Sequence, residues 1–264
     1  MKRASFMIAV LFLLPALAGA QQYEPSVGQE GKDVIWVPTP EDLVEAMLDA
    51  ARVTPNDFVM DLGSGDGRLV IAAAKRGARA VGVEYNPDMV TLSRANAEKA
   101  GVSAKATFLN ADLFATDISK ATVITMYLLP SLNMKLRPAI MDLKPGTRVV
   151  SHAFNMGDWE ADQTVEKQGR TAYLWIVPAK VEGTWSWPSN PGTAQLKLTQ
   201  TYQKIHGTLR AEGKEQAISN GKLDGDHIGF SCGGREYSGR VNGKAIKGTV
   251  KTATRQEPWS ATLP

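Results

Sequence analysis

Between residues 58 and 152, short apolar runs alternate with amphipathic segments. Runs of mostly apolar residues at 58–61, 80–84, 106–109, 123–127 and 148–152 predict strands that are covered on both faces. Apolar positions with helical spacing predict helices at 41–52, 67–76, 87–100 and about 133–143. Strands and helices alternating at this spacing predict an α/β fold with a doubly wound sheet, and residues 165–167 and 171–177 predict a terminal hairpin.

The pattern changes after Pro178, and over 183–264 helical spacing gives way to short apolar/polar alternation. Residues 221–228 and 239–246 have similar sequences, each with a dipeptide typical of two-residue hairpin turns, Asp224-Gly225 and Asn242-Gly243. We therefore predict a small antiparallel β domain over 183–264, either a meander or a half-barrel, whose tryptophans belong to its core: Trp185, Trp187 and Trp259.

The first twenty residues have the three parts of a secretory signal peptide. Lys2-Arg3 form the basic start, residues 6–17 the apolar run, and Ala18-Gly19-Ala20 a small-residue cleavage site. The apolar run is shorter than the ~20 residues of a membrane-spanning helix. We predict a signal peptide at 1–20, export to the periplasm or the medium, and no stable membrane span after cleavage; an uncleaved anchor is the alternative.

The mature chain then divides into residues 21–182 and the β domain at 183–264, and its first part, 21–35, is expected to be a loosely held arm. Composition is that of an ordinary globular protein, with a formal net charge of +3 that falls to +1 without Lys2 and Arg3. This gives no electrostatic reason to expect a nucleic-acid partner. A single cysteine, Cys232, allows no intramolecular disulfide, and no histidine lies in a spacing that predicts a metal site.

Candidate chemistry begins at the loop Asp61-Leu-Gly-Ser-Gly-Asp-Gly67, which joins a predicted strand to a predicted helix. Glycines at such a turn let a ligand approach the backbone. Their spacing, Gly63-x-Gly65-x-Gly67, differs from the G-x-G-x-x-G of dinucleotide sites. Asp61 at the strand end repels a pyrophosphate and attracts an ammonium group. These features favour S-adenosylmethionine (SAM) over NAD as the ligand.

Acidic residues also follow the next two predicted strands. Glu84 lies 21 residues beyond Gly63, where a carboxylate can accept hydrogen bonds from ribose hydroxyls. Asp112 is placed to accept from the exocyclic amine of adenine, or to cap a helix, or both. Tyr127 ends the fourth strand and is our candidate catalytic residue, as a wall of the methyl-transfer channel or a partner of the acceptor amine. His152 ends the fifth strand and is interpreted as structural.

The motifs 61–68, 72–75, 81–87 and Ser93-Arg94 resemble those of the seven-stranded SAM-dependent protein-lysine methyltransferases. The similarity is to those that modify the c-subunit of mitochondrial ATP synthase, and to their bacterial homologues. It covers about 34–178, includes Val37-Pro38-Thr39-Pro40, where that family closes the cofactor pocket, and departs at Tyr127-Leu-Leu-Pro130. The resemblance implies a Rossmann-like methyltransferase sheet and a cofactor-binding set to which we assign Thr39, Asp61, Gly63, Ser64, Gly65, Glu84 and Asp112.

The predicted function is therefore SAM-dependent methyl transfer, with a protein lysine as the preferred acceptor and a small molecule as another. Positioning a deprotonated nucleophile in line supplies most of the rate of such a transfer, so the missing catalytic triad does not argue against an enzyme. The alternatives are an exported, non-catalytic module that binds SAM or a nucleoside, and an NAD-linked oxidoreductase, which the glycine spacing disfavours. Thr39 is also the predicted N-cap of the first helix, with Pro40 at its first position.

Overall fold

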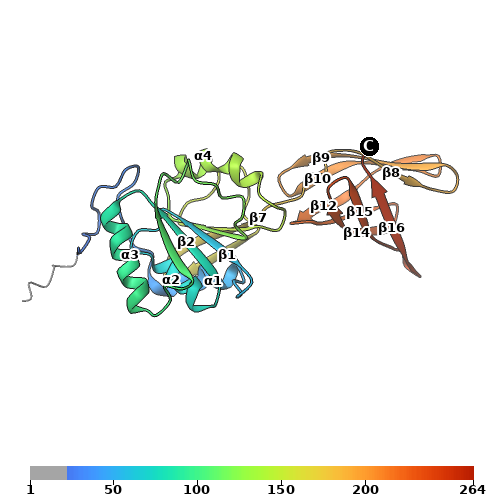
Figure 1. Ribbon diagram of the computed structural model, residues 1–264. Helices are drawn as coiled ribbons and strands as arrows, with labels where there is room; N and C mark the ends of the chain where they lie inside the picture. The colour runs from blue at the N-terminus through green and yellow to red at the C-terminus, as the bar shows by residue number, and fades with distance from the viewer. Residues whose placement is uncertain (1–22) are drawn as a thin grey trace, which may run out of the picture.

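The computed structural model describes residues 23–264, so the predicted signal peptide at 1–20 lies outside the described residues. The chain forms two successive sheets, an α/β unit and a β-barrel (Figure 1). Within residues 23–264 no helix combines the length and the apolar character that a membrane crossing requires.

The first sheet has seven strands in the order β3-β2-β1-β4-β5-β7-β6. Strands β1 to β5 pair in parallel, and β7 runs antiparallel to both β5 and β6. The predicted doubly wound sheet and its terminal hairpin are confirmed. The strands are β1 (Phe58–Leu62), β2 (Arg79–Glu84), β3 (Ala106–Asn110), β4 (Val123–Met126), β5 (Arg148–His152), β6 (Gln163–Lys167) and β7 (Arg170–Ile176).

Helices cover both faces of this sheet. This is expected because its strands have buried residues on both sides. One apolar cluster joins α1, α2 and α3 to one face, and a second joins α4 to the other. The same two layers flank the sheet in Figure 1. The helices are α1 (Glu41–Ala50), α2 (Arg68–Lys75), α3 (Pro87–Lys99) and α4 (Pro130–Met141).

Helix α1 begins at Glu41 as predicted, but the predicted N-cap is wrong by one residue. Pro40 occupies the N-cap position and no side chain caps the helix. Thr39 lies one residue earlier, where its hydroxyl hydrogen-bonds to His152 Nδ1 at 3.0 Å. The Thr-Pro pattern correctly marks the beginning of a helix, but the threonine is used for a tertiary contact instead.

The second sheet is a closed antiparallel barrel, a more complete form of the predicted meander. Its order β10-β12-β13-β14-β15-β16-β8-β9 closes because β9 also pairs with β10, while β11 extends the edge of β10. The strands are β8 (Gly183–Pro188), β9 (Thr193–Thr201), β10 (Lys204–Ala211), β11 (Lys214–Ala217), β12 (Ser219–Asp224), β13 (His227–Cys232), β14 (Arg235–Asn242), β15 (Ala245–Lys251) and β16 (Gln256–Thr262).

Inward-facing side chains fill the barrel. Trp185 and Trp259 are buried in its core with Phe230 and Tyr237, and Trp187 packs edge-on against Trp259. The two predicted hairpins also form, but their turns lie one residue later, at 225–226 and 243–244. In both turns glycine takes the first loop position with a positive φ, as two-residue turns of type II′ require.

Candidate active site

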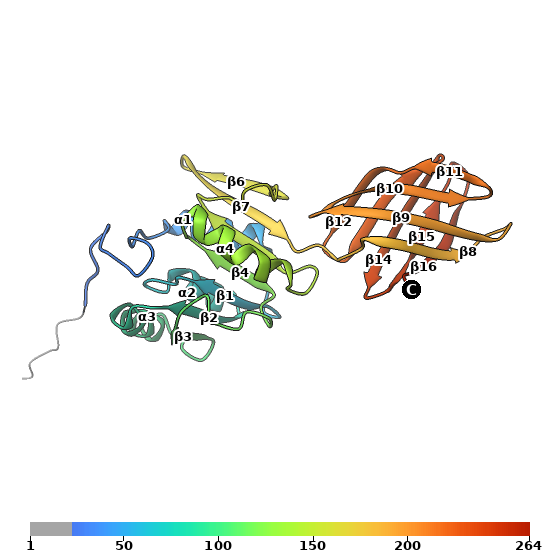
Figure 2. The same cartoon turned by 90° about the horizontal axis from the view of Figure 1, so that it is seen from above.

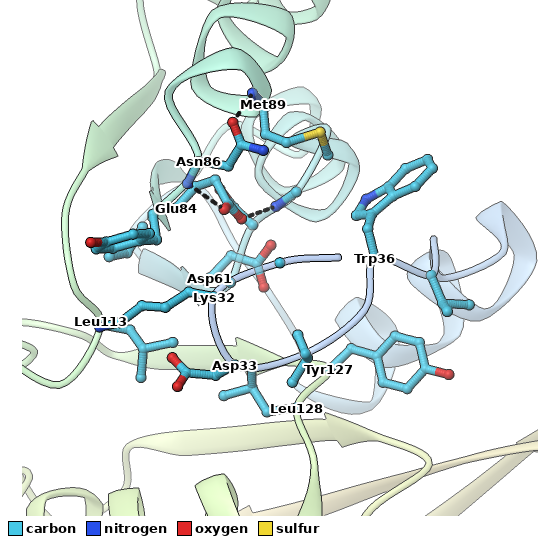
Figure 3. A pocket seen from close by; sticks show the side chains of 18 of the residues that line it. Lys32, Asp33, Trp36, Asp61, Glu84, Asn86, Met89, Leu113, Tyr127 and Leu128 are labelled. Atoms are coloured by element: carbon cyan, nitrogen blue, oxygen red, sulfur yellow. Dashed lines mark hydrogen bonds between the residues drawn. The ribbon is translucent and has the colours of Figure 1, made fainter. Parts of the chain in front are cut away.

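A cavity of about 650 Å³ opens at the carboxyl ends of β1, β2 and β4 (Figure 3). This is the edge of a doubly wound sheet at which ligands bind, because the strand order reverses there. The predicted catalytic residue Tyr127 lines the cavity, and so do all seven residues predicted to bind the cofactor: Thr39, Asp61, Gly63, Ser64, Gly65, Glu84 and Asp112. Three successive strand ends therefore bring their acidic side chains to one pocket.

The glycine loop gives the cavity its floor. Gly63 and Gly65 have φ of 81° and 54°, the left-handed region that side chains rarely adopt. A Cβ on Gly65 would lie 2.7 Å from Trp36 Nε1. The hydroxyl of Ser64 is buried here without a hydrogen-bond partner among the described residues. That hydroxyl points away from the cavity, since a Cβ on Gly82 of β2 would lie 2.5 Å from it; what the loop offers to a ligand is its backbone.

Asp61 lies at the bottom of the cavity and is 3% exposed. Thr125 Oγ1, on β4, donates to Asp61 Oδ1 at 2.7 Å. Burial raises the pKa of this carboxyl from 3.8 to about 7, and the neighbouring carboxylates of Glu84 and Asp66 add to the increase while the Thr125 bond opposes it. A buried carboxylate that is bonded to a neutral hydroxyl is suited to a ligand that brings a positive charge.

Glu84 ends β2 on the opposite side of the loop. Its Oε2 accepts from the amide of Gly65 at 3.0 Å and its Oε1 from the amide of Asn86 at 2.9 Å. These two bonds fix the carboxylate at the cavity wall (Figure 3). Each oxygen keeps a further lone pair, so the group can also accept from a pair of hydroxyls.

Asp112 does not cap a helix, which was one of the roles considered for it from sequence, because a turn and not a helix follows β3. Its Oδ1 accepts from the amide of Phe114 at 2.8 Å within this turn. Its Oδ2 pairs with Lys32 Nζ at 2.6 Å, and this contact with Lys32 holds the pKa of Asp112 below its usual range. Lys32 also lies over the ring of Tyr85, at 4.5 Å from the ring centre. Asp112 thus ties the N-terminal arm to the cavity wall.

The N-terminal arm forms a wall of the cavity instead of hanging loosely. Hydrogen bonds from the amide of Gly28 to Trp36 O and from the amide of Trp36 to Gln29 O fold it back on itself. Residues 29–39 line the cavity, and Trp36 (Figure 3) lies against Gly65 of the glycine loop. The prediction of a loosely held arm at 21–35 is therefore wrong for the residues described: the anchor, Trp36, follows directly after the polar segment whose composition suggested a loose arm.

The other end of the cavity is aromatic and apolar. Tyr127 packs against His152 with 3.8 Å between ring centres and 34° between ring planes, and its ring centre lies 6.2 Å from that of Phe154. Burial lowers the pKa of His152 from 6.5 to about 4, with a smaller contribution from Arg170, so the imidazole is neutral near pH 7.

Thr39 has a second anchor here besides His152, since its carbonyl accepts from Arg68 Nη1 at 2.7 Å. These contacts fix the N-terminal end of α1 against the end of β5.

The residues present fit SAM. Asp61 supplies a buried negative charge for an ammonium group, and Glu84 supplies paired acceptors for ribose hydroxyls. Gly63 and Gly65 carry no side chains of their own, so the backbone amides and carbonyls of the loop can be approached closely. Within residues 23–264 there is no group of three or more His, Cys, Asp or Glu side chains that could hold a metal ion.

Comparisons with known proteins agree with this geometry. Residues 61–163 match the family model of the ANTKMT methyltransferase domain. A protein-lysine N-methyltransferase of Saccharolobus islandicus is 44% identical over 151 residues, which make up 54% of this chain and 94% of that protein. The lysine N-methyltransferase of the ATP synthase c-subunit in Mus musculus is 32% identical over 167 residues, 63% of this chain and 67% of that protein.

A solved structure is similar as well. It is the crystal structure of an RNA methyltransferase from Salinibacter ruber in complex with S-adenosyl-L-homocysteine, with 52% identity and a TM-score of 0.54. The similarity covers 55% of this chain and 96% of that one. The family match ends at residue 163, ahead of the barrel.

Fold and pocket together define a class I methyltransferase whose cofactor is SAM. Within that class, the chain belongs to the methyltransferase family that contains the protein-lysine N-methyltransferase of Saccharolobus islandicus.

Proposed function

We propose that this enzyme transfers a methyl group from SAM to the side-chain amine of a lysine in a protein. The observation that carries the proposal is the apolar and aromatic end of the cavity, lined by Tyr127, Leu128, Leu132 and Phe154. A long alkyl chain with a terminal amine fits such a wall. The names of the two curated relatives, which are both lysine N-methyltransferases, support this choice.

The residues of this end are suited to an amine nucleophile. An apolar wall disfavours the charged ammonium and so lowers the pKa of a lysine that enters it. SAM, when bound, supplies a methyl group on a sulfonium, whose departure leaves a neutral thioether. The amine lone pair forms the N–C bond as the S–C bond breaks, and the amine proton leaves to water. Tyr127 is proposed to line this channel and position the amine, since most of the rate comes from alignment.

Two measurements on residues 21–264 test the proposal. Calorimetric titration with SAM is expected to show binding that the double substitution Asp61→Ala and Glu84→Ala abolishes. Transfer of a tritiated methyl group into a protein extract, followed by mass spectrometry of the labelled peptide, is expected to place the label on lysine. Binding of SAM without label in any acceptor would instead favour the non-catalytic binding module.

A second candidate acceptor is RNA, because the similar Salinibacter ruber structure is described as an RNA methyltransferase. The same assay separates the two acceptors when the labelled extract is divided between ribonuclease and protease. Label that is released by ribonuclease and survives protease would overturn the lysine proposal.

We further propose that the protein is exported, on the strength of the basic, apolar and small-residue segments at 1–20. Expression of the full chain in a bacterial host, with fractionation and N-terminal sequencing, tests this. Export predicts a product in the periplasm that starts at Gln21. A cytoplasmic product that retains Lys2 and Arg3 would contradict it.

A further inference from the structure

The barrel lies at the end of the molecule opposite the N-terminal arm (Figures 1 and 2). The register of β7 explains this placement. Its last residue, Ile176, pairs with Arg148 at the amino end of β5, whereas the cavity opens at the carboxyl ends of the parallel strands. The barrel therefore does not line the cavity. Any effect of the barrel on the cavity must be transmitted through the residues that lie between the two.

One segment connects the two regions, the stretch from Ala153 to Asp162 between β5 and β6. At its start Phe154 forms part of the apolar wall of the cavity. At its other end Trp159 is fully buried and stacks on Tyr202 of the barrel, with 5.8 Å between ring centres and 16° between ring planes. The segment thus runs from the acceptor wall to the barrel.

Tyr202 is held for this contact in an unfavourable backbone conformation. It lies in the turn between β9 and β10 with a φ of 54°, which a bulky residue rarely adopts. Gln200 Nε2 donates to the carbonyl of Tyr202 at 2.8 Å, and the next residue, Gln203, donates from Nε2 to Glu160 O at 2.8 Å. A conformation of this kind persists only where its surroundings impose it.

Helix α4 of the α/β unit also binds the segment from Ala153 to Asp162. Asn133 Nδ2 donates to Phe154 O at 3.1 Å and to Asn155 O at 3.2 Å. One turn further along, Arg137 donates to Met156 O at 2.9 Å, pairs with Asp158 and lies over the ring of Tyr202 at 5.4 Å. The segment is therefore clamped between α4 and the tip of the β9–β10 hairpin.

We propose that the barrel, through Tyr202, is a positioning element that fixes residues 154–159 and with them the acceptor wall at Phe154. The inference rests on the proposed function for its kinetic consequences, but its structural part does not. Tyr202 touches neither cofactor nor acceptor; it acts on the wall through Trp159 and Arg137. Losing it should therefore affect acceptor binding and leave SAM binding unchanged.

The test compares Tyr202→Ala with Tyr202→Phe, which keeps the ring and loses only the hydroxyl. A control, Lys180→Ala, removes the exposed pair between Lys180 and Asp142 at 2.5 Å, which lies near the barrel junction without touching residues 154–159. In the full mature chain, Tyr202→Ala is expected to raise the acceptor KM at least fivefold with the SAM Kd within twofold of the parent. Tyr202→Phe and Lys180→Ala should stay within twofold in both.

Hydrogen–deuterium exchange tests the structural part without any activity. In Tyr202→Ala, amides of residues 153–160 should exchange faster while those of the glycine loop at 61–67 do not change. If the wild-type protein methylates no lysine, the proposed function fails but this result still stands. Unchanged exchange at 153–160 in a folded Tyr202→Ala variant would overturn the positioning role. Unchanged acceptor KM beside faster exchange would show that the wall does not bind the acceptor.

Discussion

Thr125 Oγ1 donates a 2.7 Å hydrogen bond to Asp61 Oδ1 across the carboxyl ends of β4 and β1, and both side chains are almost completely buried. This bond is the only hydrogen bond to the Asp61 side chain within the described residues, and burial raises the carboxyl pKa to about 7. Ionised Asp61 therefore destabilises the folded state, and a cationic ligand group would offset that destabilisation.

The first prediction concerns this charge. Because the folded pKa of Asp61 lies above 3.8, the folded state holds more protons than the unfolded state between about pH 4 and 7, and stability falls as pH rises through that window. Asp61→Asn keeps the acceptor for Thr125 and removes the charge. Relative to the wild type it should be more stable at pH 8 by about 4 kcal/mol and nearly equal at pH 4. Urea unfolding at the two pH values measures this, and equal differences at both would contradict the raised pKa.

His152 gives the second prediction, with the opposite sign. Its folded pKa of about 4 lies below 6.5, so the folded state holds fewer protons between these values and stability is lost as pH falls from about 6.5 towards 4. Replacing His152 by Gln, which cannot titrate, should remove this acid sensitivity. The wild-type and variant curves of unfolding free energy against pH should converge on acidification. Parallel curves would mean that the imidazole titrates normally.

The sequence predicted the strands and helices of the α/β unit because their patterns are local. The apolar runs of β1 to β5 and the glycine spacing depend on a few neighbouring residues. The three strand-end carboxylates followed from topology, since parallel strands end at one edge. Contacts of the arm, such as Lys32 with Asp112, join residues 80 positions apart and have no local signature.

The barrel was predicted as a β domain but not as a closed one. Alternation and turn dipeptides indicate hairpins, whereas closure depends on the pairing of β9 with both β8 and β10. The position of Thr39 shows a similar limit. Its sequence context fits a helix cap, and a tertiary bond to His152 uses the hydroxyl instead.

The third prediction tests Glu84 as the ribose acceptor. Glu84→Gln replaces one carboxylate oxygen by an NH₂ group, which would face the backbone amide of Gly65 or Asn86, or a ligand hydroxyl. SAM affinity should fall at least tenfold, about 1.4 kcal/mol. The control is Glu98→Gln on the exposed face of α3, which should bind SAM as the wild type does. Calorimetry gives both values, and equal affinities in the two variants would place the ribose elsewhere.

The last prediction concerns the approach of Trp36 to the glycine loop. Gly65→Ala puts a Cβ 2.7 Å from Trp36 Nε1, whereas Gly101→Ala, also at a positive φ, meets nothing within 4 Å. Both variants should lose about 1 kcal/mol of stability to backbone strain. Only Gly65→Ala should also lose SAM affinity, at least tenfold, because the arm can no longer close on the loop. In a Trp36→Leu background the clash is relieved, so the further effect of Gly65→Ala on the SAM Kd should shrink. An effect of equal size in both backgrounds would show that the arm and the loop bind the cofactor independently.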